Sequence, residues 1–156
     1  MDSNRIVYNC QFVKNNCQNK VIRTKDISAA DKRLIKQTGT LTKNLISLMN
    51  NQDLNNYIKS VIDISFLTNK YINDEEPWKL KSENTNKMNN ILHLSLEQIA
   101  KISILLSPII PNASVKVLNA LKIKEKSRNL SFIKGKEIIP KELNISDLNI
   151  LFKKIN

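Results

Sequence analysis

Apolar residues recur at intervals of three and four along most of the chain, which is the spacing of amphipathic helices. The first such segment covers about residues 3–16, and the polar stretch 18–25 that follows it reads as a loop. Ser28 and Asp31 then form a capping-box pattern, in which each side chain can accept a hydrogen bond from the other residue's backbone N–H. This pattern predicts a second helix that begins after Ser28 and ends at the polar pair 50–51.

The third helical segment, at about residues 53–72, has apolar residues on two of its faces. The first stripe contains Leu54, Ile58, Ile62 and Phe66, and the second contains Ile64, Leu67 and Tyr71. A helix that is apolar on two sides is typical of the centre of a bundle. We therefore expect this helix near the centre of the bundle.

Prolines divide the next part of the chain. A fourth helix at about 83–106 ends at the break 107–111, because proline cannot donate a hydrogen bond to the helix backbone. Asn112 is a suitable cap for a short fifth helix. The acidic run Asp74-Glu75-Glu76 is typical of a solvated helix end rather than of a paired catalytic carboxylate.

After residue 122 the helical pattern weakens. We expect an extended tail that packs back on the helices and ends in a last helical turn near 147–155. The predicted fold is all-α, a bundle of about five helices at 1–122 with a C-terminal tail at 123–156.

Composition restricts the function. The 156 residues are enough for one ordinary domain, and no apolar run approaches the roughly 18–20 residues that cross a bilayer. The only glycines are Gly39 and Gly135, so the glycine-rich loops that hold nucleotide phosphates are absent. Cys10 and Cys17 are too few for a disulfide framework and lack zinc-site spacing, which favours reduced thiols in a cytosolic protein.

The charge is unevenly distributed along the chain. The formal net charge is +11; residues 1–76 contain 11 basic and 8 acidic residues, whereas the remainder contains 14 and 6. Such a field favours an anionic partner, with nucleic acid preferred over a membrane because no strongly amphipathic basic helix is present.

Conventional catalytic groups are scarce. His93 is the only histidine, and we expect a structural or surface role because no oriented partners accompany it. Trp78 is the only tryptophan and follows Pro77, whose ring restricts the backbone at this corner. Two interpretations remain open: the indole stacks on an unpaired RNA base, or it closes the end of the bundle.

Residues 66–80 resemble a signature of one family, the anticodon-binding domain of methionyl-tRNA synthetases. In that signature a helix ends in an Asn-x-Tyr element, here Asn69 and Tyr71, and a Pro-Trp pair follows after an acidic stretch.

Two further segments carry the same resemblance. Residues 105–111 are similar to the family's Leu-x-Pro-x-x-Pro break, and residues 151–156 are similar to its Leu-Phe-Pro-Arg-Ile-Glu-like end. The three segments agree with the family in order and approximate spacing over essentially the whole chain.

The resemblance implies an RNA-binding site. It implies that Trp78 stacks on the first anticodon base, a cytosine, and that the family's Asn-x-x-x-Arg pair on the first helix falls on Asn4 and Tyr8. Tyr8 departs from the pattern, because tyrosine lacks the charged bidentate fork of arginine. Arg5 is adjacent but lies about 100° further around the helix.

The resemblance also implies a larger parent enzyme. The His-x-Gly-His and Lys-Met-Ser-Lys-Ser signatures of class I catalytic domains are absent here, so we expect a C-terminal part of a methionine–tRNA ligase that binds tRNA without forming methionyl adenylate. Its expected partners are methionine tRNA with a CAU anticodon and the catalytic domain of the same synthetase, with no membrane. ATP and Mg²⁺ would serve that catalytic domain, in the bacterial cytoplasm or an organellar matrix.

Other interpretations stay open at this point. The chain could be the anticodon-binding domain of another class I synthetase, which competition between anticodon stem-loops would distinguish. It could also be a helical protein-interaction module, which predicts salt-tolerant binding to a protein and no affinity for RNA. A stand-alone enzyme is the weakest interpretation.

Overall fold

The computed structural model describes residues 3–148, with side chains from Ile6 onward. Helices account for most of this part. The α-helices are α1 (Ser3–Cys17), α2 (Ala29–Lys43), α3 (Leu45–Asn50), α4 (Leu54–Glu75), α5 (Thr85–Leu106) and α6 (Pro111–Ala120). The short elements are β1 (Lys20–Ile22), η1 (Glu125–Ser127), η2 (Leu130–Lys134) and β2 (Glu142–Asn144), where η denotes a 3-10 helix. The predicted all-α fold is confirmed.

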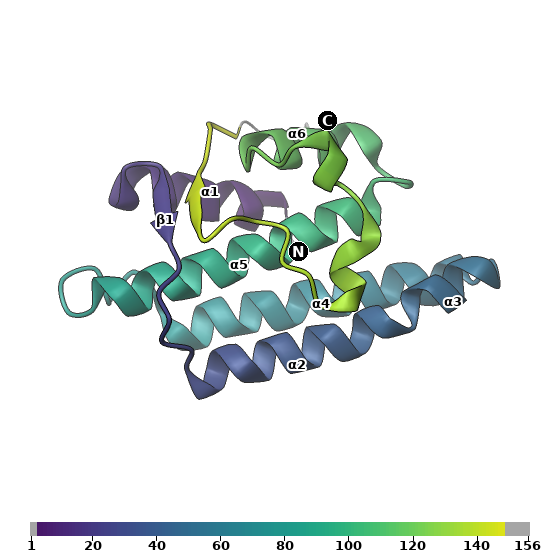
Figure 1. Cartoon of the computed structure of the whole chain (residues 1–156), viewed down its shortest axis with the longest axis horizontal. Coiled ribbons are helices and arrows are strands. Elements are labelled where there is room, and N and C mark those ends of the chain that lie inside the picture. The colour runs from purple at the N-terminus through teal and green to yellow at the C-terminus, as the bar shows by residue number, and fades with distance from the viewer. Residues whose placement is uncertain (1–2, 149–156) are drawn as a thin grey trace, which may run out of the picture.

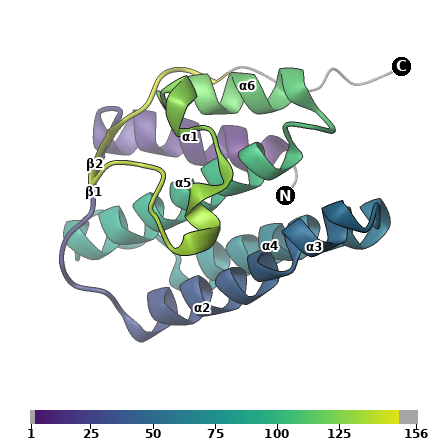
Figure 2. The ribbon, with the colours of Figure 1, turned by 45° about the vertical axis from the view of Figure 1, so that its right-hand side comes forward.

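Helix α5 occupies the centre of the bundle. It packs against α4 on one side and α6 on the other, and α2 packs against α4 (Figure 1). Every residue from Asn90 to Ala100 is buried, so several turns of α5 are enclosed on all faces. Helix α1 lies above α5 on the α6 side of the molecule (Figures 1 and 2).

Helix α4 is not covered on both of its apolar stripes, as a helix at the centre of the bundle would be. The stripe with Ile64 (0% exposed) and Tyr71 (6%) faces the core, but Leu54, Ile62 and Phe66 are 50%, 41% and 64% exposed. The reason is that α2, α3 and α5 cover only part of α4. The central position belongs to α5, and one side of α4 presents apolar side chains to solvent.

The start of α2 agrees with the capping-box prediction. The Ser28 hydroxyl accepts from the Asp31 N–H (3.1 Å), and the Asp31 carboxylate accepts from the Ser28 N–H (3.0 Å). The predicted single helix up to residue 50 is instead two helices, because Asn44 ends α2 and begins α3.

The polar stretch after α1 contains a strand that the sequence analysis missed. Strand β1 pairs antiparallel with β2, and Val21 lies opposite Leu143. Three-residue strands are too short for their periodicity to be read from sequence, and this pair joins segments more than a hundred residues apart. The pairing attaches the tail to the segment that follows α1 in the chain.

Buried polar groups of α5 also hold the tail. The Glu97 carboxylate accepts from the backbone N–H groups of Ile138 (3.0 Å) and Ile139 (2.9 Å). The His93 Nε2–H donates to the carbonyl oxygen of Pro140 (2.8 Å). The tail therefore follows α5 back across the bundle (Figure 2). The predicted last helical turn at 147–155 falls almost entirely outside the described residues.

The tail and the helices share one core. Ile123, Phe132 and Leu143 are buried in the same hydrophobic cluster as residues of α1, α5 and α6. Within the described residues, no helix combines the length and the hydropathy needed to cross a membrane.

Candidate RNA-binding site

Helix α4 turns sharply into residues 76–81, which we call the Trp78 corner. Glu76 ends the helix in a left-handed conformation (φ 44°), and its carbonyl accepts a hydrogen bond from the Lys79 N–H (2.9 Å). The Pro77 ring restricts the backbone between these two residues. The corner is stiff because a closed turn and a proline hold the same few residues.

The Trp78 ring is accessible while its neighbours are anchored. Pro77 is buried. Half-buried Leu80 packs against two clusters of buried apolar side chains, the large one shared by α1, α5, α6 and the tail and a smaller one that contains Leu34 and Tyr71. Trp78 itself is 39% exposed, and its indole N–H makes no hydrogen bond within the described residues. A ring with these properties is partly open to an incoming planar group, rather than enclosed in the bundle.

The charges around the corner are largely paired. Three lysines and three carboxylates form ion pairs at 2.8–3.0 Å: Lys79 with Glu76, Lys87 with Glu75, and Lys70 with Asp74. Lys81, at the end of the corner, has no ion pair among the described residues, so the corner offers an aromatic ring with one unpaired cation nearby.

Tyr71 fixes the end of α4 from which the corner begins. Its hydroxyl donates to the Asp31 carboxylate (2.7 Å), and the side chain is 6% exposed. Burial, together with this carboxylate, raises the pKa of Tyr71. The tyrosine of the Asn-x-Tyr element is thus a structural link between α4 and the first turn of α2.

Helix α1 carries the other predicted RNA contacts. Asn4 and Arg5 lie in the first turns, where the structure describes the helix but not these side chains. Tyr8 is 49% exposed, and its ring centroid lies 6.3 Å from that of Phe12 in a tilted arrangement. Helix geometry places Asn4 and Tyr8 on one face, since they are four residues apart.

The Trp78 corner meets α1 at the C-terminal end of that helix. The Lys81 ammonium donates to the Asn16 side-chain oxygen (3.1 Å). Tyr8 lies eight residues before Asn16, a separation of about 12 Å along the helix axis. In the described part of the chain no hydrogen bond or ring contact joins Trp78 to Tyr8, so the structure does not bring these two predicted site residues into contact.

A polar cavity beside the corner was missed by the sequence analysis. It has a volume of about 410 Å³ and lies between residues 24–31 and the start of α5. Asn84, Asn86 and Asn90 contribute to its lining. Their close spacing was a usable signal, but asparagine is so frequent in this chain that three together did not stand out.

His93 and Cys10 are buried in the bundle. His93 is 1% exposed, and burial lowers its pKa, as expected for the structural role predicted for it. Burial raises the pKa of the Cys10 thiol to about 12. Among the residues that the structure describes, no three His, Cys, Asp or Glu side chains gather in a way that could hold a metal ion.

Comparison with known proteins gives consistent results. Residues 21–156 match the sequence model of a family described as the anticodon binding domain of methionyl tRNA ligase. The methionine–tRNA ligase of Rickettsia prowazekii is 31% identical over 111 residues, which cover 71% of this chain and 22% of that protein. The methionine–tRNA ligase of Brucella suis is 24% identical over 120 residues, covering 77% of this chain and 23% of that protein.

The fold is also found in solved structures. A crystal structure of Mycobacterium tuberculosis methionyl-tRNA synthetase bound by methionyl-adenylate superposes with a TM-score of 0.87 at 17% identity. The match covers 97% of this chain and 30% of that one. The chain therefore spans less than a third of the length of these relatives.

Proposed function

Because the chain belongs to the family of anticodon-binding domains of methionyl-tRNA ligases, we propose that it binds the anticodon of a methionine tRNA. The observation that carries this proposal is the partly exposed Trp78 ring on its stiff corner. Stacking of an unpaired base on a fixed aromatic ring contributes about 1–3 kcal/mol and depends little on the base. The specificity for CAU must therefore come from groups around the ring.

Helix α1 supplies those groups in the proposed site. Tyr8 has an exposed ring and one hydroxyl, which can stack on a second base or form one hydrogen bond. Asn4, on the same helical face, has a side chain that can donate to and accept from a base edge, and we assign Arg5 to a phosphate contact because arginine pairs with phosphate. The roughly 12 Å between Tyr8 and the end of α1 suits a loop whose bases are splayed apart.

The whole protein is proposed to be a methionine–tRNA ligase. Relatives that carry this domain in less than a third of their length bear that name. In the proposal, ATP and Mg²⁺ act in the catalytic domain, and the present segment contributes only tRNA binding. The place of action is the cytoplasm of a bacterium or the matrix of an organelle.

A binding experiment tests the proposal. Trp78→Ala should weaken binding of a CAU anticodon stem-loop by about 1–3 kcal/mol, measured by fluorescence anisotropy, whereas Trp78→Phe should retain part of the affinity. Phe66→Ala is a matched control, because it removes an exposed aromatic ring from the surface of α4.

Two outcomes would contradict the proposal. Unchanged binding by Trp78→Ala would show that the ring is not in the site. Equal affinity for CAU and for unrelated anticodon stem-loops would favour the domain of another class I synthetase.

The exposed stripe of α4 supports a second candidate function, docking of a partner protein. Leu54, Ile62 and Phe66 present apolar side chains on one side of the helix. Exposed apolar patches commonly mark protein interfaces. This function predicts salt-tolerant binding to a protein that Phe66→Asp abolishes, and no affinity for RNA.

A further inference from the structure

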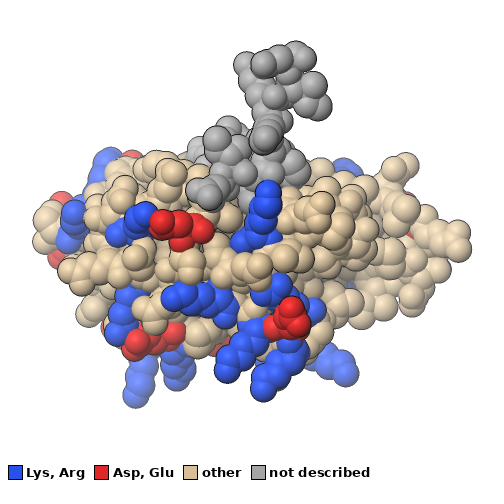
Figure 3. Space-filling view, turned by 90° about the horizontal axis from the view of Figure 1, so that it is seen from above, with Lys and Arg blue, Asp and Glu red and all other residues tan. Residues whose placement is uncertain are grey.

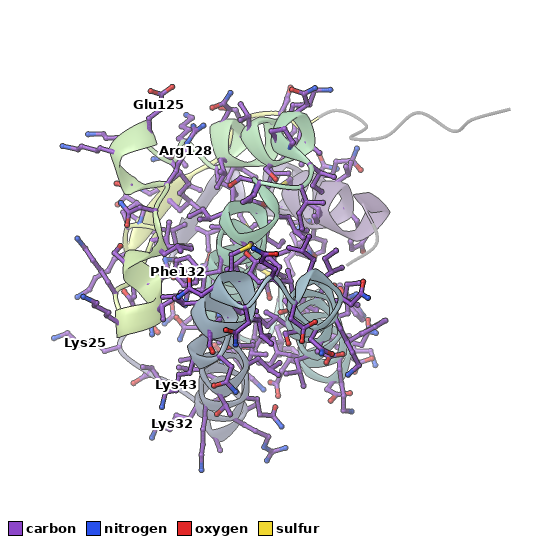
Figure 4. All side chains as sticks on the ribbon, turned by 90° about the vertical axis from the view of Figure 1, so that its right-hand side faces the viewer. Lys25, Lys32, Lys43, Glu125, Arg128 and Phe132 are labelled. Carbon is purple, nitrogen blue, oxygen red and sulfur yellow. The ribbon has the colours of Figure 1, made fainter. Side chains whose placement is uncertain are left out.

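A basic face lies on the side of the molecule opposite α1. Basic side chains gather along one edge of the molecule seen from above, with fewer acidic side chains among them (Figure 3). Lys32 and Lys43 of α2 lie on this side together with Lys25 and with Phe132 of η2 (Figure 4). We call this surface, with Lys134 at the end of η2, the α2–tail face.

A cavity opens on the α2–tail face. Its volume is about 490 Å³, and its walls come from α2, α5 and η2. The apolar residues Ile35, Phe132 and Ile133 line it together with Lys43 and Lys134. This volume falls in the range of about 300–1,000 Å³ that is usual for sites of small organic ligands.

The cationic groups of this cavity differ in whether they are neutralised. Arg23 is paired with Glu137, and Lys101 is paired with Glu97. Lys43 and Lys134 have no ion pair within the described residues and are exposed. The cavity therefore keeps two free positive charges at its edge after its own carboxylates are satisfied.

Gly39 keeps the α2 wall of the cavity open. It lies inside α2, where glycine is less favourable than alanine, and its φ is not positive. A Cβ built on Gly39 would meet no atom within 4 Å. Neither the backbone conformation nor close packing therefore requires a glycine here. The absence of a side chain leaves open space in the cavity.

We propose that the cavity of the α2–tail face binds one nucleotide of a single-stranded RNA segment, with its flanking phosphates held by Lys43 and Lys134. The cavity provides apolar walls for a base and free cations for phosphates, which is the combination that single-strand-binding grooves use. The choice of RNA among polyanions rests on the proposed function. The site is separate from the Trp78 corner and from α1, and so adds a second RNA contact to the chain.

A pair of charge-matched variants tests the phosphate contacts. The probe is a fluorescently labelled run of ten uridines, which is unstructured and contains no CAU triplet. Lys43→Gln with Lys134→Gln should weaken binding about tenfold and reduce the slope of log K against log salt by about 1.4, because each phosphate contact on a single strand contributes about 0.7. Lys59→Gln with Lys70→Gln removes the same charge from α4 and should change affinity less than twofold.

A second pair of variants tests the cavity without changing charge. Gly39→Leu places a side chain in the cavity and should weaken binding about fivefold or more. Thr40→Leu adds an apolar side chain to the exposed side of the same helix and should leave binding unchanged. Addition of the uridine probe should also shift the Gly39 amide signal in a ¹⁵N–¹H spectrum.

Three results would overturn the proposal. If the two pairs of lysine variants weakened binding equally, only a diffuse effect of net charge would be shown. If Gly39→Leu bound the probe as well as Thr40→Leu does, no base would enter the cavity. If Lys43→Gln with Lys134→Gln abolished binding to anionic phospholipid vesicles but left RNA binding intact, the face would be assigned to a membrane surface. Trp78→Ala leaves the cavity itself unchanged, so the fold-change that Lys43→Gln with Lys134→Gln causes should be the same with and without Trp78→Ala. Failure of the anticodon proposal is therefore distinguishable from failure of this one.

Discussion

The Trp78 corner and the α2–tail face both carry lysines, but their lysines are in different electrostatic states. Around the corner, Lys70, Lys79 and Lys87 each lie within 3.0 Å of a carboxylate oxygen, and only Lys81 there lacks a carboxylate partner among the described residues. On the α2–tail face, Lys43 and Lys134 have no such partner among the described residues. The net charge of +11 therefore does not act evenly on a ligand.

This difference separates two contributions to RNA binding. Phosphate contacts by free cations give affinity that depends strongly on salt, whereas stacking and base contacts give specificity. The corner has an aromatic ring and paired charges, so it is suited to recognition with a small salt dependence. The α2–tail face has free charges around a cavity, so it is suited to holding the backbone of the RNA.

The α2–tail face exists only while the tail is attached to α5. Glu97→Ala, which removes a side chain that holds the tail, should have the largest effect on the free energy of unfolding. Its carboxylate accepts from two backbone N–H groups, that of half-buried Ile138 and that of buried Ile139. Leaving these donors unsatisfied should lower the free energy of unfolding by about 2–4 kcal/mol, measured in urea. Hydrogen exchange at residues 138–139 should accelerate, whereas the fluorescence of Trp78, the only tryptophan, should not change under native conditions.

A matched control and a contrary outcome define this test. Glu83→Ala removes an exposed carboxylate before α5 and should change stability by less than about 0.5 kcal/mol. If Glu97→Ala altered Trp78 fluorescence as strongly as exchange in the tail, the two regions would form one cooperative unit and could not be compared separately.

Local signals explain what the sequence analysis predicted correctly. The Ser28–Asp31 capping box needs only neighbouring residues, so its pattern in the sequence was sufficient. The position of Trp78 at a corner followed from Pro77 and the end of a helical pattern. Both features are set by backbone hydrogen bonds within a few residues.

Non-local packing explains what the sequence analysis missed. The two stripes of α4 look alike in sequence, and which one is covered depends on where α2 and α5 lie. The β1–β2 pair and the cavity beside Gly39 each join segments that are far apart in the chain. Gly39 inside a helical pattern was the one visible signal of that cavity.

Acid should loosen the tail by an intermediate amount. Burial lowers the pKa of His93 below its ordinary value of 6.5, so the unfolded chain binds this proton more readily than the folded chain. The contribution of neutral His93 to stability is therefore complete above about pH 6.5 and falls as the pH drops below it, by at most about 1.4 kcal/mol per pH unit. Urea unfolding between pH 7.5 and 5 measures this dependence.

His93→Gln is the control for this dependence. Its side-chain amide can still donate to the Pro140 carbonyl but does not titrate, so the difference in pH dependence between the two proteins isolates His93. An identical decline in both proteins would assign the acid sensitivity to carboxylates instead. As the pH is lowered, the tail and the α2–tail face should therefore lose structure before the Trp78 corner does.

The smallest expected effect comes from Lys79→Gln, next to Trp78. The Lys79 side chain is 64% exposed and that of its partner Glu76 is 41% exposed, so breaking this solvent-screened pair should change the free energy of unfolding by less than about 0.5 kcal/mol. Because this charge is already neutralised, binding of the uridine probe should weaken less than twofold, against about threefold for Lys43→Gln alone. Glu76→Gln should instead free the Lys79 ammonium and strengthen binding slightly. If Lys79→Gln weakened binding as much as Lys43→Gln, ion pairing would not distinguish the two regions, and the assignment of phosphate contacts to the α2–tail face would lose its electrostatic basis.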